Sequence, residues 1–553
     1  MKAAVLERSS DRSQPSQVRG WLPIASILVV SVAARIACLL ARPMVIESEG
    51  AYYARVAENL AAGVGWIGMH AWGVQLLYPP LFPLLIAGVH LMGPNVELAA
   101  RLVSLFFGSL LVIPVFLIAE GMYGQRVGQI AALMTALHPV LVGASVAVLS
   151  EASYTFFLFT GILCSILAAR SQYRWTALGA GVVFGLAYLI RPEALLLTLV
   201  TAAIVVLYGW KHRSKAIQVA ICQIAAFAIL AAPYVVFLKV QTGQFRLEGK
   251  SSSNFLLSQM LMQGMSLNQV NYAIDDDLTP RGLNMRSDLE VIHSTKFDLA
   301  TSMRMIRTAA GQNTRLLFIY LTKEQACGGA LLMGLVMLGL FGSAWNRERA
   351  AGEGVLITIL VFLVVPLFSL IFFNSRFVIP FLPLLIVWAA KGVDEFAKWS
   401  QDTAHNLLPG SGWATRTGLI ASGCALGGML LIGWATVQNF PDLRRDDLAV
   451  KTLGLQLKRQ FPGIGKIMDV SPIPAFYAGA VVRNYPYTDS STALRYIAAS
   501  KIDLLVLREH GSEMLTPYLK DWQTNGVPDP RAELLLTVPT QEYGQIKVYR
   551  WRQ

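Results

Sequence analysis

VIESEGAYYARVAENLAAGVGWIGMHAWGVQLLYPPLFP, residues 45–83, is the stretch that decides the fold. It follows the first long hydrophobic run but is itself too polar to span a bilayer. Apolar residues recur in it at helical spacing, which predicts a short amphipathic helix from Glu49, suited to a membrane surface; they are Tyr53, Val56, Ala57 and Leu60. Gly63 and Gly65 end this helix, and the Pro79-Pro80 pair prevents any helix from running straight into the apolar residues from Leu81 onward.

Composition identifies most of the chain as a membrane domain. Hydrophobic residues make up 54% of the 553 positions and charged residues 14%. Apolar runs near the length of a bilayer recur from Leu22 almost to Val437, which predicts a polytopic α-helical membrane protein with about 11–13 transmembrane helices. Eleven runs are assigned as spans, at about 21–42, 97–119, 126–147, 151–169, 174–190, 194–210, 216–239, 323–344, 354–373, 377–390 and 413–436. The segment 81–93 is too short to cross and is assigned as a juxtamembrane or half-inserted helix.

The basic residues set the orientation. This assignment gathers the basic loop residues on one side of the membrane: Arg126, Arg170, Arg174, Lys211, Arg213, Lys215, Arg347, Arg349, Lys391 and Lys398. Cytoplasmic loops accumulate Lys and Arg, so this side and the N-terminus are predicted to be cytoplasmic, in a cytoplasmic (inner) membrane. The basic residues of these loops also account for the net charge of +12. We therefore expect the protein to contact membrane lipids and not to bind nucleic acid.

The chain is predicted to contain three parts. They are a cytoplasmic N-terminus over 1–20, a transmembrane domain over 21–439 with outer loops at 43–96 and 241–320, and a soluble extracytoplasmic α/β domain over 440–553. The longer loop includes a predicted helix over 296–310. In the last part, helix and strand patterns alternate and end in two strands near 532–538 and 544–550, as in a small α/β layer structure.

Six charged residues are placed on the outer face, at helix ends: Glu47, Glu49, Glu151, Arg191, Glu193 and Arg376. Each has a structural explanation, because acids suit the first turn of a helix and arginines anchor at membrane interfaces. Their convergence on one face from distant helices favours a function. A carboxylate base, a second carboxylate and two guanidinium groups suit transfer from a phosphate-linked donor to a hydroxyl or an amine. The sequence has no Walker A, HExxH or GxSxG elbow motif, which favours a lipid-linked donor over a nucleotide sugar.

Several motifs resemble those of the C-type (GT-C fold) membrane glycosyltransferases, in particular the protein O-mannosyltransferases and the lipid A aminoarabinose transferases. The segment from Glu49 to Leu60, followed by Tyr78-Pro-Pro-Leu-Phe-Pro83, resembles their first outer loop. Leu149-Ser-Glu151 is similar to their second acidic motif. Further similar elements are Ile190-Arg-Pro-Glu193, Ser375-Arg-Phe-Val-Ile-Pro380 and, in the soluble domain, Ile473–Gly479. The resemblance covers nearly the whole chain in order.

This resemblance implies an inverting glycosyltransferase that moves a sugar from a polyprenyl-phosphate-linked donor to a lipid, glycan or protein acceptor outside the membrane. Matching positions make Glu49 the catalytic base and Glu151 the second acid; the candidate substrate-binding residues are Tyr53, Tyr78, Pro80, Arg191, Glu193 and Arg376. No cofactor is required, although a divalent cation, if one takes part, would be bound by Glu49 and Glu151. The sequence departs from the family pattern at Gly50, where a second acid often follows, and at Tyr78, where the aminoarabinose transferases have a lysine that contacts the donor phosphate.

Two other classes of protein remain as alternatives. A polytopic transporter or flippase of a lipid-linked or anionic substrate also has many helices with charged residues, although transporters usually show repeat symmetry and charges at the membrane midplane. A polymerase or ligase of surface glycans would use the same donor with a lipid-linked polymer as acceptor. The sugar, the acceptor and the roles of the 241–320 loop and the terminal domain stay open at this point.

Overall fold

The computed structural model describes residues 15–41, 45–369, 373–409, 413–436, 448–510, 516–540 and 543–553. Within these ranges the chain forms a large helical domain and a small domain built on one five-stranded sheet, which confirms the predicted fold class. Most of the predicted N-terminal segment 1–20 and the predicted domain boundary near 439 lie outside the described residues.

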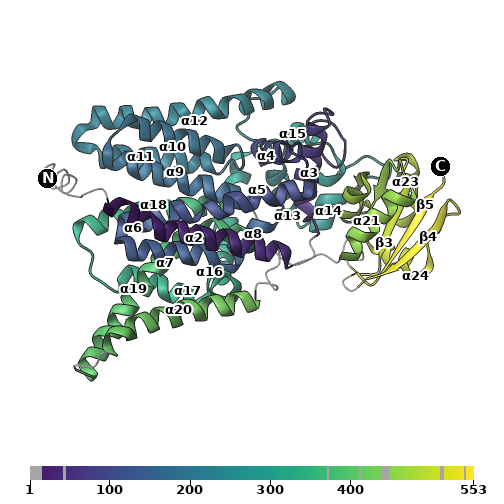
Figure 1. The fold of residues 1–553 in the computed structure, drawn as a ribbon. Coiled ribbons are helices and arrows are strands. Elements are labelled where there is room, and N and C mark those ends of the chain that lie inside the picture. Colours follow the sequence, from purple (N-terminus) through teal and green to yellow (C-terminus); the bar gives the residue numbers. More distant parts are fainter. Residues whose placement is uncertain are drawn as a thin grey trace.

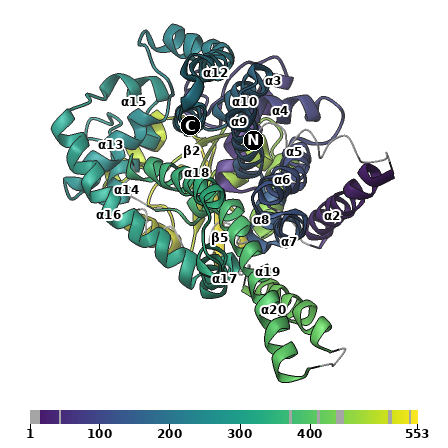
Figure 2. The ribbon, with the colours of Figure 1, turned by 90° about the vertical axis from the view of Figure 1, so that its left-hand side faces the viewer.

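The helical domain is an assembly of many helices around an apolar core. Its α-helices are α2 (Pro15–Leu40), α3 (Ser48–Ala61), α4 (Leu81–His90), α5 (Val96–Leu110), α6 (Val112–Tyr123), α7 (Gln125–Leu137), α8 (Pro139–Val146), α9 (Glu151–Ser171), α10 (Arg174–Tyr188), α11 (Ala194–Tyr208), α12 (Arg213–Thr242), α13 (Ser251–Met262), α14 (Leu267–Tyr272), α15 (Asp288–Ser294), α16 (Leu299–Lys323), α17 (Gly329–Phe341), α18 (Arg347–Val364), α19 (Leu382–Leu407) and α20 (Ala414–Thr436). Seen end on, α13 to α16 occupy one side of the domain and α2 the opposite side (Figure 2).

Seven helical segments in the described ranges are long and apolar enough to cross a membrane. Helices α7 and α8 form an eighth candidate span, bent by 51° at the break between them, where Pro139 begins the second helix. Every predicted span overlaps a helix, although three of them fall on α10, α11 and α17, which have only 13–15 residues. The helix predicted at 296–310 is α16, which continues to Lys323.

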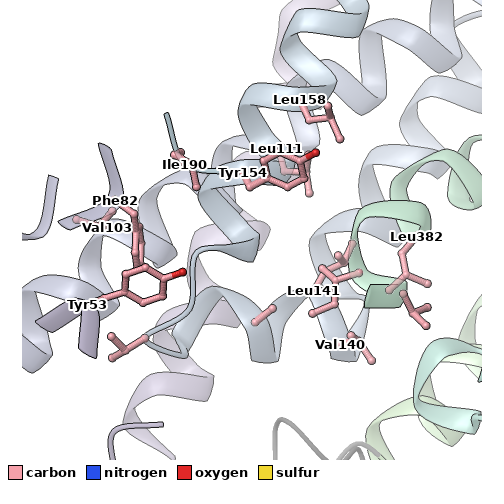
Figure 3. Close-up of a cluster of buried hydrophobic side chains, with 14 of the residues drawn as sticks. Tyr53, Phe82, Val103, Leu111, Val140, Leu141, Tyr154, Leu158, Ile190 and Leu382 are labelled. Atoms are coloured by element: carbon pink, nitrogen blue, oxygen red, sulfur yellow. The ribbon is translucent and has the colours of Figure 1, made fainter. Parts of the chain in front are cut away.

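Helix α3 has the predicted amphipathic pattern, but it buries its apolar face against protein. Tyr53, Val56 and Ala57 are buried, and the helix packs on α4 and α5. The ring of Tyr53 meets the edge of Phe82 with 5.1 Å between ring centroids (Figure 3). At Gly50 an added Cβ would lie 2.6 Å from the carbonyl oxygen of Val148, so the backbone contact between the two segments leaves no room for the second acid that often follows here in the family.

The sheet of the C-terminal domain has the strand order β2-β1-β3-β5-β4. Its strands are β1 (Lys466–Met468), β2 (Val481–Arg483), β3 (Leu504–Arg508), β4 (Ala532–Pro539) and β5 (Gln545–Trp551), and its helices are α21 (Leu448–Gln460), α22 (Ile473–Ala478), α23 (Ser490–Ala499) and α24 (Pro517–Asn525). Strands β2, β1 and β3 run parallel to one another. Strand β5 pairs antiparallel with β3, and β4 pairs antiparallel with β5. The α/β fold that the alternating pattern predicted for this part of the chain is therefore confirmed.

The C-terminal domain docks on the first outer loop (Figure 1). Glu97 of α5 accepts hydrogen bonds from Lys451 Nζ at 2.8 Å and from Tyr477 Oη at 2.9 Å. The backbone N–H of Val482 in β2 donates to the carbonyl oxygen of Met69 at 3.1 Å. The loop that follows α3 is thus held between the helical domain and the edge of the sheet.

Candidate active site

Four elements bring carboxylates and guanidinium groups together on one side of α3. Glu49, in the first turn of α3, accepts hydrogen bonds from Tyr53 Oη at 3.2 Å and from Nη2 of Arg376. Arg376 lies in the 3₁₀ helix Ser375–Phe381, and its Nε is 3.5 Å from Glu151 Oε1 at the start of α9. Nη2 of Arg191, in the turn between α10 and α11, donates to the same Glu151 oxygen at 2.5 Å. We call this alternating row, Glu49–Arg376–Glu151–Arg191, the charge chain.

The charge chain is anchored in the protein at its Glu151 end. The side chain of Glu151 is fully buried, whereas those of Glu49, Arg191 and Arg376 keep 14–18% of their surface exposed. Ser150 accepts a hydrogen bond from Arg191 Nε at 3.1 Å, with Tyr53 Oη at 3.5 Å from the same hydroxyl. Removing the charge of any one member of the charge chain would therefore leave the charge of its neighbour buried without its ion-pair partner.

Glu49 is held in its ionised form. Burial alone would raise the pKa of its carboxyl, but the positive charges of Arg376, Lys250 and Arg191 outweigh burial and lower the pKa to about 2. The carboxylate is therefore deprotonated throughout the physiological pH range, and it is a weak base for as long as Arg376 stays bonded to it.

Two cavities meet at Glu49. The first, of about 380 Å³, we call the apolar cavity; its walls include Glu49, Tyr53, Tyr78, Pro79, Arg191, Glu193, Lys250, Phe255, Phe297, Met305, Arg376 and Phe377. The second, of about 310 Å³, we call the polar cavity; its walls include Ser48, Glu49, Tyr52, His70, Trp72, Gln75, Tyr78, Lys250, Asn284, Arg286 and Asp288. Glu49, Leu77, Tyr78 and Lys250 belong to both. A ligand in either cavity can thus reach the same carboxylate.

The structure brings most of the predicted site residues together. Glu49, Tyr53, Tyr78, Arg191, Glu193 and Arg376 all line the apolar cavity. Glu151 does not line it, but lies behind Arg191 and Arg376 as their shared partner. Pro80 is also outside the cavity wall, at the N-terminal cap of α4, and its neighbour Pro79 lines the cavity instead.

Sequence reasoning missed the contribution of the 241–320 loop. Lys250 lines both cavities, and Ser251, Asn254 and Phe255 of α13 line the apolar one. A Cβ at Gly249 would lie 1.8 Å from the carbonyl oxygen of Leu76, so the two outer loops touch backbone to backbone just before Lys250. The available signal was the run Gly249-Lys-Ser-Ser-Ser253 ahead of an apolar stretch, which is typical of a helix start.

The proposed metal ligands are occupied by guanidinium groups. Glu49 is bonded to Arg376, and Glu151 to Arg191 and Arg376. In the part of the chain that the structure describes, no three His, Cys, Asp or Glu side chains converge as a metal site. A divalent cation between these two carboxylates would have to displace Arg376, so the arrangement does not fit a resident metal ion.

The helical domain carries these charged groups next to the loop 43–96, and the small α/β domain docks on that loop, which is the arrangement that the resemblance to the C-type membrane glycosyltransferases implies. The family described as dolichyl-phosphate-mannose-protein mannosyltransferase matches residues 78–237, which is less than a third of the chain. No curated protein sequence matches the chain significantly.

Solved structures show the same fold over nearly the whole chain. ArnT from Cupriavidus metallidurans bound to undecaprenyl phosphate is 13% identical and aligns over 97% of this chain and 98% of its own, with a TM-score of 0.56. The oligosaccharyltransferase AglB from Archaeoglobus fulgidus, in complex with an inhibitory peptide and a dolichol-phosphate, is 12% identical. It aligns over 98% of this chain and 75% of its own, with a TM-score of 0.54. A complex of the A. fulgidus oligosaccharyltransferase with Zn and sulfate is 13% identical and aligns over 95% of this chain and 73% of its own, with a TM-score of 0.53. The predicted C-type fold is confirmed.

Proposed function

We propose that the protein is an inverting glycosyltransferase that moves a sugar from a polyprenyl-phosphate-linked donor to a lipid, glycan or protein acceptor. The observation that carries this function is the Glu49 carboxylate at the junction of two cavities, bonded to Arg376 and close to Arg191. The matched mannosyltransferase family and the polyprenyl phosphates named with ArnT and AglB support a donor of this class. Nothing in these comparisons favours the transporter alternative.

The two cavities suit the two substrates. The apolar cavity combines aromatic and aliphatic walls with the arginines of the charge chain, which fits a lipid chain carrying a phosphate-linked sugar. The polar cavity has hydroxyl, amide and charged side chains, which fit an acceptor that presents a hydroxyl or an amine. Glu49 lies between them and is within reach of the acceptor proton.

Donor binding also activates the base. A phosphate in the apolar cavity competes with Glu49 for the guanidinium of Arg376, because both are anions that suit bidentate hydrogen bonding. As Arg376 turns toward the phosphate, the pKa of Glu49 rises toward its ordinary value and the carboxylate becomes a stronger base. Glu49 therefore becomes a stronger base only when a donor is bound, and it stays a weak base when the apolar cavity is empty.

A direct assay tests this function. Purified protein is incubated with undecaprenyl-phosphate sugars and with membrane extract as the source of acceptor, with and without EDTA. We expect transfer of the sugar from one such donor, and we expect EDTA to change the rate by less than about 2-fold, because Arg376 occupies the place of a cation. Absence of transfer from every donor would contradict the function, and loss of activity in EDTA restored by a divalent cation would contradict the metal-free mechanism.

We further propose that the site faces outward from a cytoplasmic membrane, as the basic residues of the opposite loops indicate. Single cysteines at two exposed positions test this, one at Asp276 in the 241–320 loop and one at Lys211 between α11 and α12. In intact cells a membrane-impermeant maleimide should label the Asp276→Cys protein and spare the Lys211→Cys protein until the cells are permeabilised. The reverse pattern would place the site in the cytoplasm.

A further inference from the structure

We propose that Lys250 binds the phosphate of the donor and stabilises the negative charge that this phosphate gains as the sugar leaves. The inference rests on the function proposed above and adds to it a residue from the second outer loop. It concerns a single ammonium group at the wall shared by the two cavities.

The charge balance of the reaction creates the need for such a cation. The bond between the anomeric carbon and the phosphate oxygen breaks, and its electron pair stays on that oxygen. The acceptor oxygen bonds to the anomeric carbon, and its proton goes to the Glu49 carboxylate. The donor phosphodiester carries one negative charge, whereas the polyprenyl phosphate released carries nearly two at neutral pH. A cation beside this oxygen therefore binds the transition state more strongly than the donor.

The arginines of the charge chain already have carboxylate partners. Arg376 is bonded to Glu49 and Glu151, and Arg191 is bonded to Glu151. Either guanidinium reaches the phosphate only by giving up part of an existing ion pair. In the described ranges, by contrast, no carboxylate lies within ion-pair distance of the Lys250 ammonium, so a phosphate can bind it without breaking a direct ion pair.

The position of Lys250 is fixed by its backbone. Gly249 packs on the carbonyl of Leu76, and the Lys250 N–H donates to Glu248 Oε2 at 2.6 Å. The ammonium lies 5.8 Å from the centroid of the Tyr78 ring, so the lysine of one outer loop stands over the tyrosine of the other. Lys250 is also the N-cap of α13, whose first turn lines the apolar cavity and adds a positive end of a helix dipole. The field of this group is already felt at Glu49, since its charge helps to lower the pKa of that carboxyl.

The test compares Lys250→Ala and Lys250→Arg with Lys296→Ala, a control in the same outer loop that lines neither cavity. Three quantities are measured for each protein: kcat for the donor that the wild type uses, KM for that donor, and inhibition by free undecaprenyl phosphate. We expect Lys250→Ala to lower kcat by roughly 10- to 100-fold, the effect of losing one hydrogen bond to a charged group. Inhibition by undecaprenyl phosphate should weaken more than donor KM rises, because the released phosphate carries the larger charge. Lys250→Arg should keep much of the activity, and methylammonium should restore part of it to Lys250→Ala.

Thermal unfolding of each purified protein separates a loss of charge from a loss of fold, and we expect all three variants to unfold at the wild-type temperature. A Lys250→Ala protein that matches Lys296→Ala in kcat and in product inhibition would overturn the role of Lys250 while the proposed function stands. A fall in kcat with unchanged product inhibition and no rescue by methylammonium would overturn it as well. Failure of the wild type to transfer sugar from any donor would instead overturn the proposed function and this inference with it.

Discussion

Replacing Glu49 by Gln should lower kcat for sugar transfer by about 10³-fold, the contribution expected of a positioned general base. Glutamine keeps the size of the side chain and its place between Tyr53 and Arg376, but it cannot accept the acceptor proton. Donor KM should stay the same or fall, because Arg376 then keeps only Glu151 as a charged partner and the donor phosphate no longer competes for it with a second carboxylate. Steady-state kinetics with varied donor and saturating acceptor measure both quantities.

Glu58→Gln is the matched control, because Glu58 lies on the same helix and pairs with Arg55 on its half-exposed face, away from both cavities. We expect this variant to keep kcat within about 2-fold of wild type, since exposed ion pairs contribute little. A Glu49→Gln protein with wild-type turnover would remove Glu49 from the role of base.

The ion pairs of Glu49 also give stability a pH dependence. Because its pKa is lowered, they stabilise the fold at pH values above the ordinary pKa of Glu, and this contribution is lost as the pH falls toward about 2.

Replacing Glu151 by Ala should destabilise the protein by about 3–5 kcal/mol, the cost of breaking a buried ion pair by removing one partner. Glu151 is fully buried, and its loss leaves Arg191 without an ion-pair partner and Arg376 with Glu49 alone. The protein that remains folded should also have a lower kcat, because Arg191 is then no longer held at the apolar cavity by an ion pair and Arg376 is held there by Glu49 alone. Thermal unfolding in detergent and kcat per folded molecule measure the two effects separately.

Glu353→Ala provides the comparison for this experiment. Glu353 of α18 is also fully buried and accepts hydrogen bonds from Tyr123 Oη at 2.7 Å, Trp388 Nε1 at 2.8 Å and Arg349 Nε at 3.2 Å, away from both cavities. We expect a similar loss of stability with kcat per folded molecule within about 2-fold of wild type. If Glu151→Ala behaves in the same way, the charge chain serves the fold and has no part in transfer.

Much of the fold could be predicted because single residues determine local structure. The Pro79-Pro80 pair and the glycines after Leu60 mark where α3 and α4 end and begin, and the alternation of patterns after Phe461 gives the strands of the sheet. The clustering of several charged residues could be predicted because charges at helix ends on one membrane face are costly unless they serve a purpose. Glu49, Arg191 and Arg376 belong to this group.

The remaining features depend on packing between distant segments, which no local pattern reveals. The pattern of α3 suited a membrane surface, but α3 packs against α4, α5 and α22, which bury its apolar face in protein. Lys250 could not be found by its charge, because it lies in a loop with other exposed basic residues, and only the contact of Gly249 with Leu76 brings it to the site. A sequence also does not show that the predicted second acid, Glu151, pairs with both Arg191 and Arg376.

The docking of the C-terminal domain also dictates the order in which the protein can be assembled. The segment from α3 to α5 is among the earliest to leave the ribosome, yet its partners in the C-terminal domain are among the last. Glu97 accepts its hydrogen bonds from Lys451 and Tyr477, which follow it in the chain by 354 and 380 positions and are therefore synthesised much later. A chain whose translation has not reached β2 lacks the backbone donor that the Met69 carbonyl has in the complete fold. We therefore expect the loop that follows α3 to reach its final position only after the C-terminal domain has been synthesised.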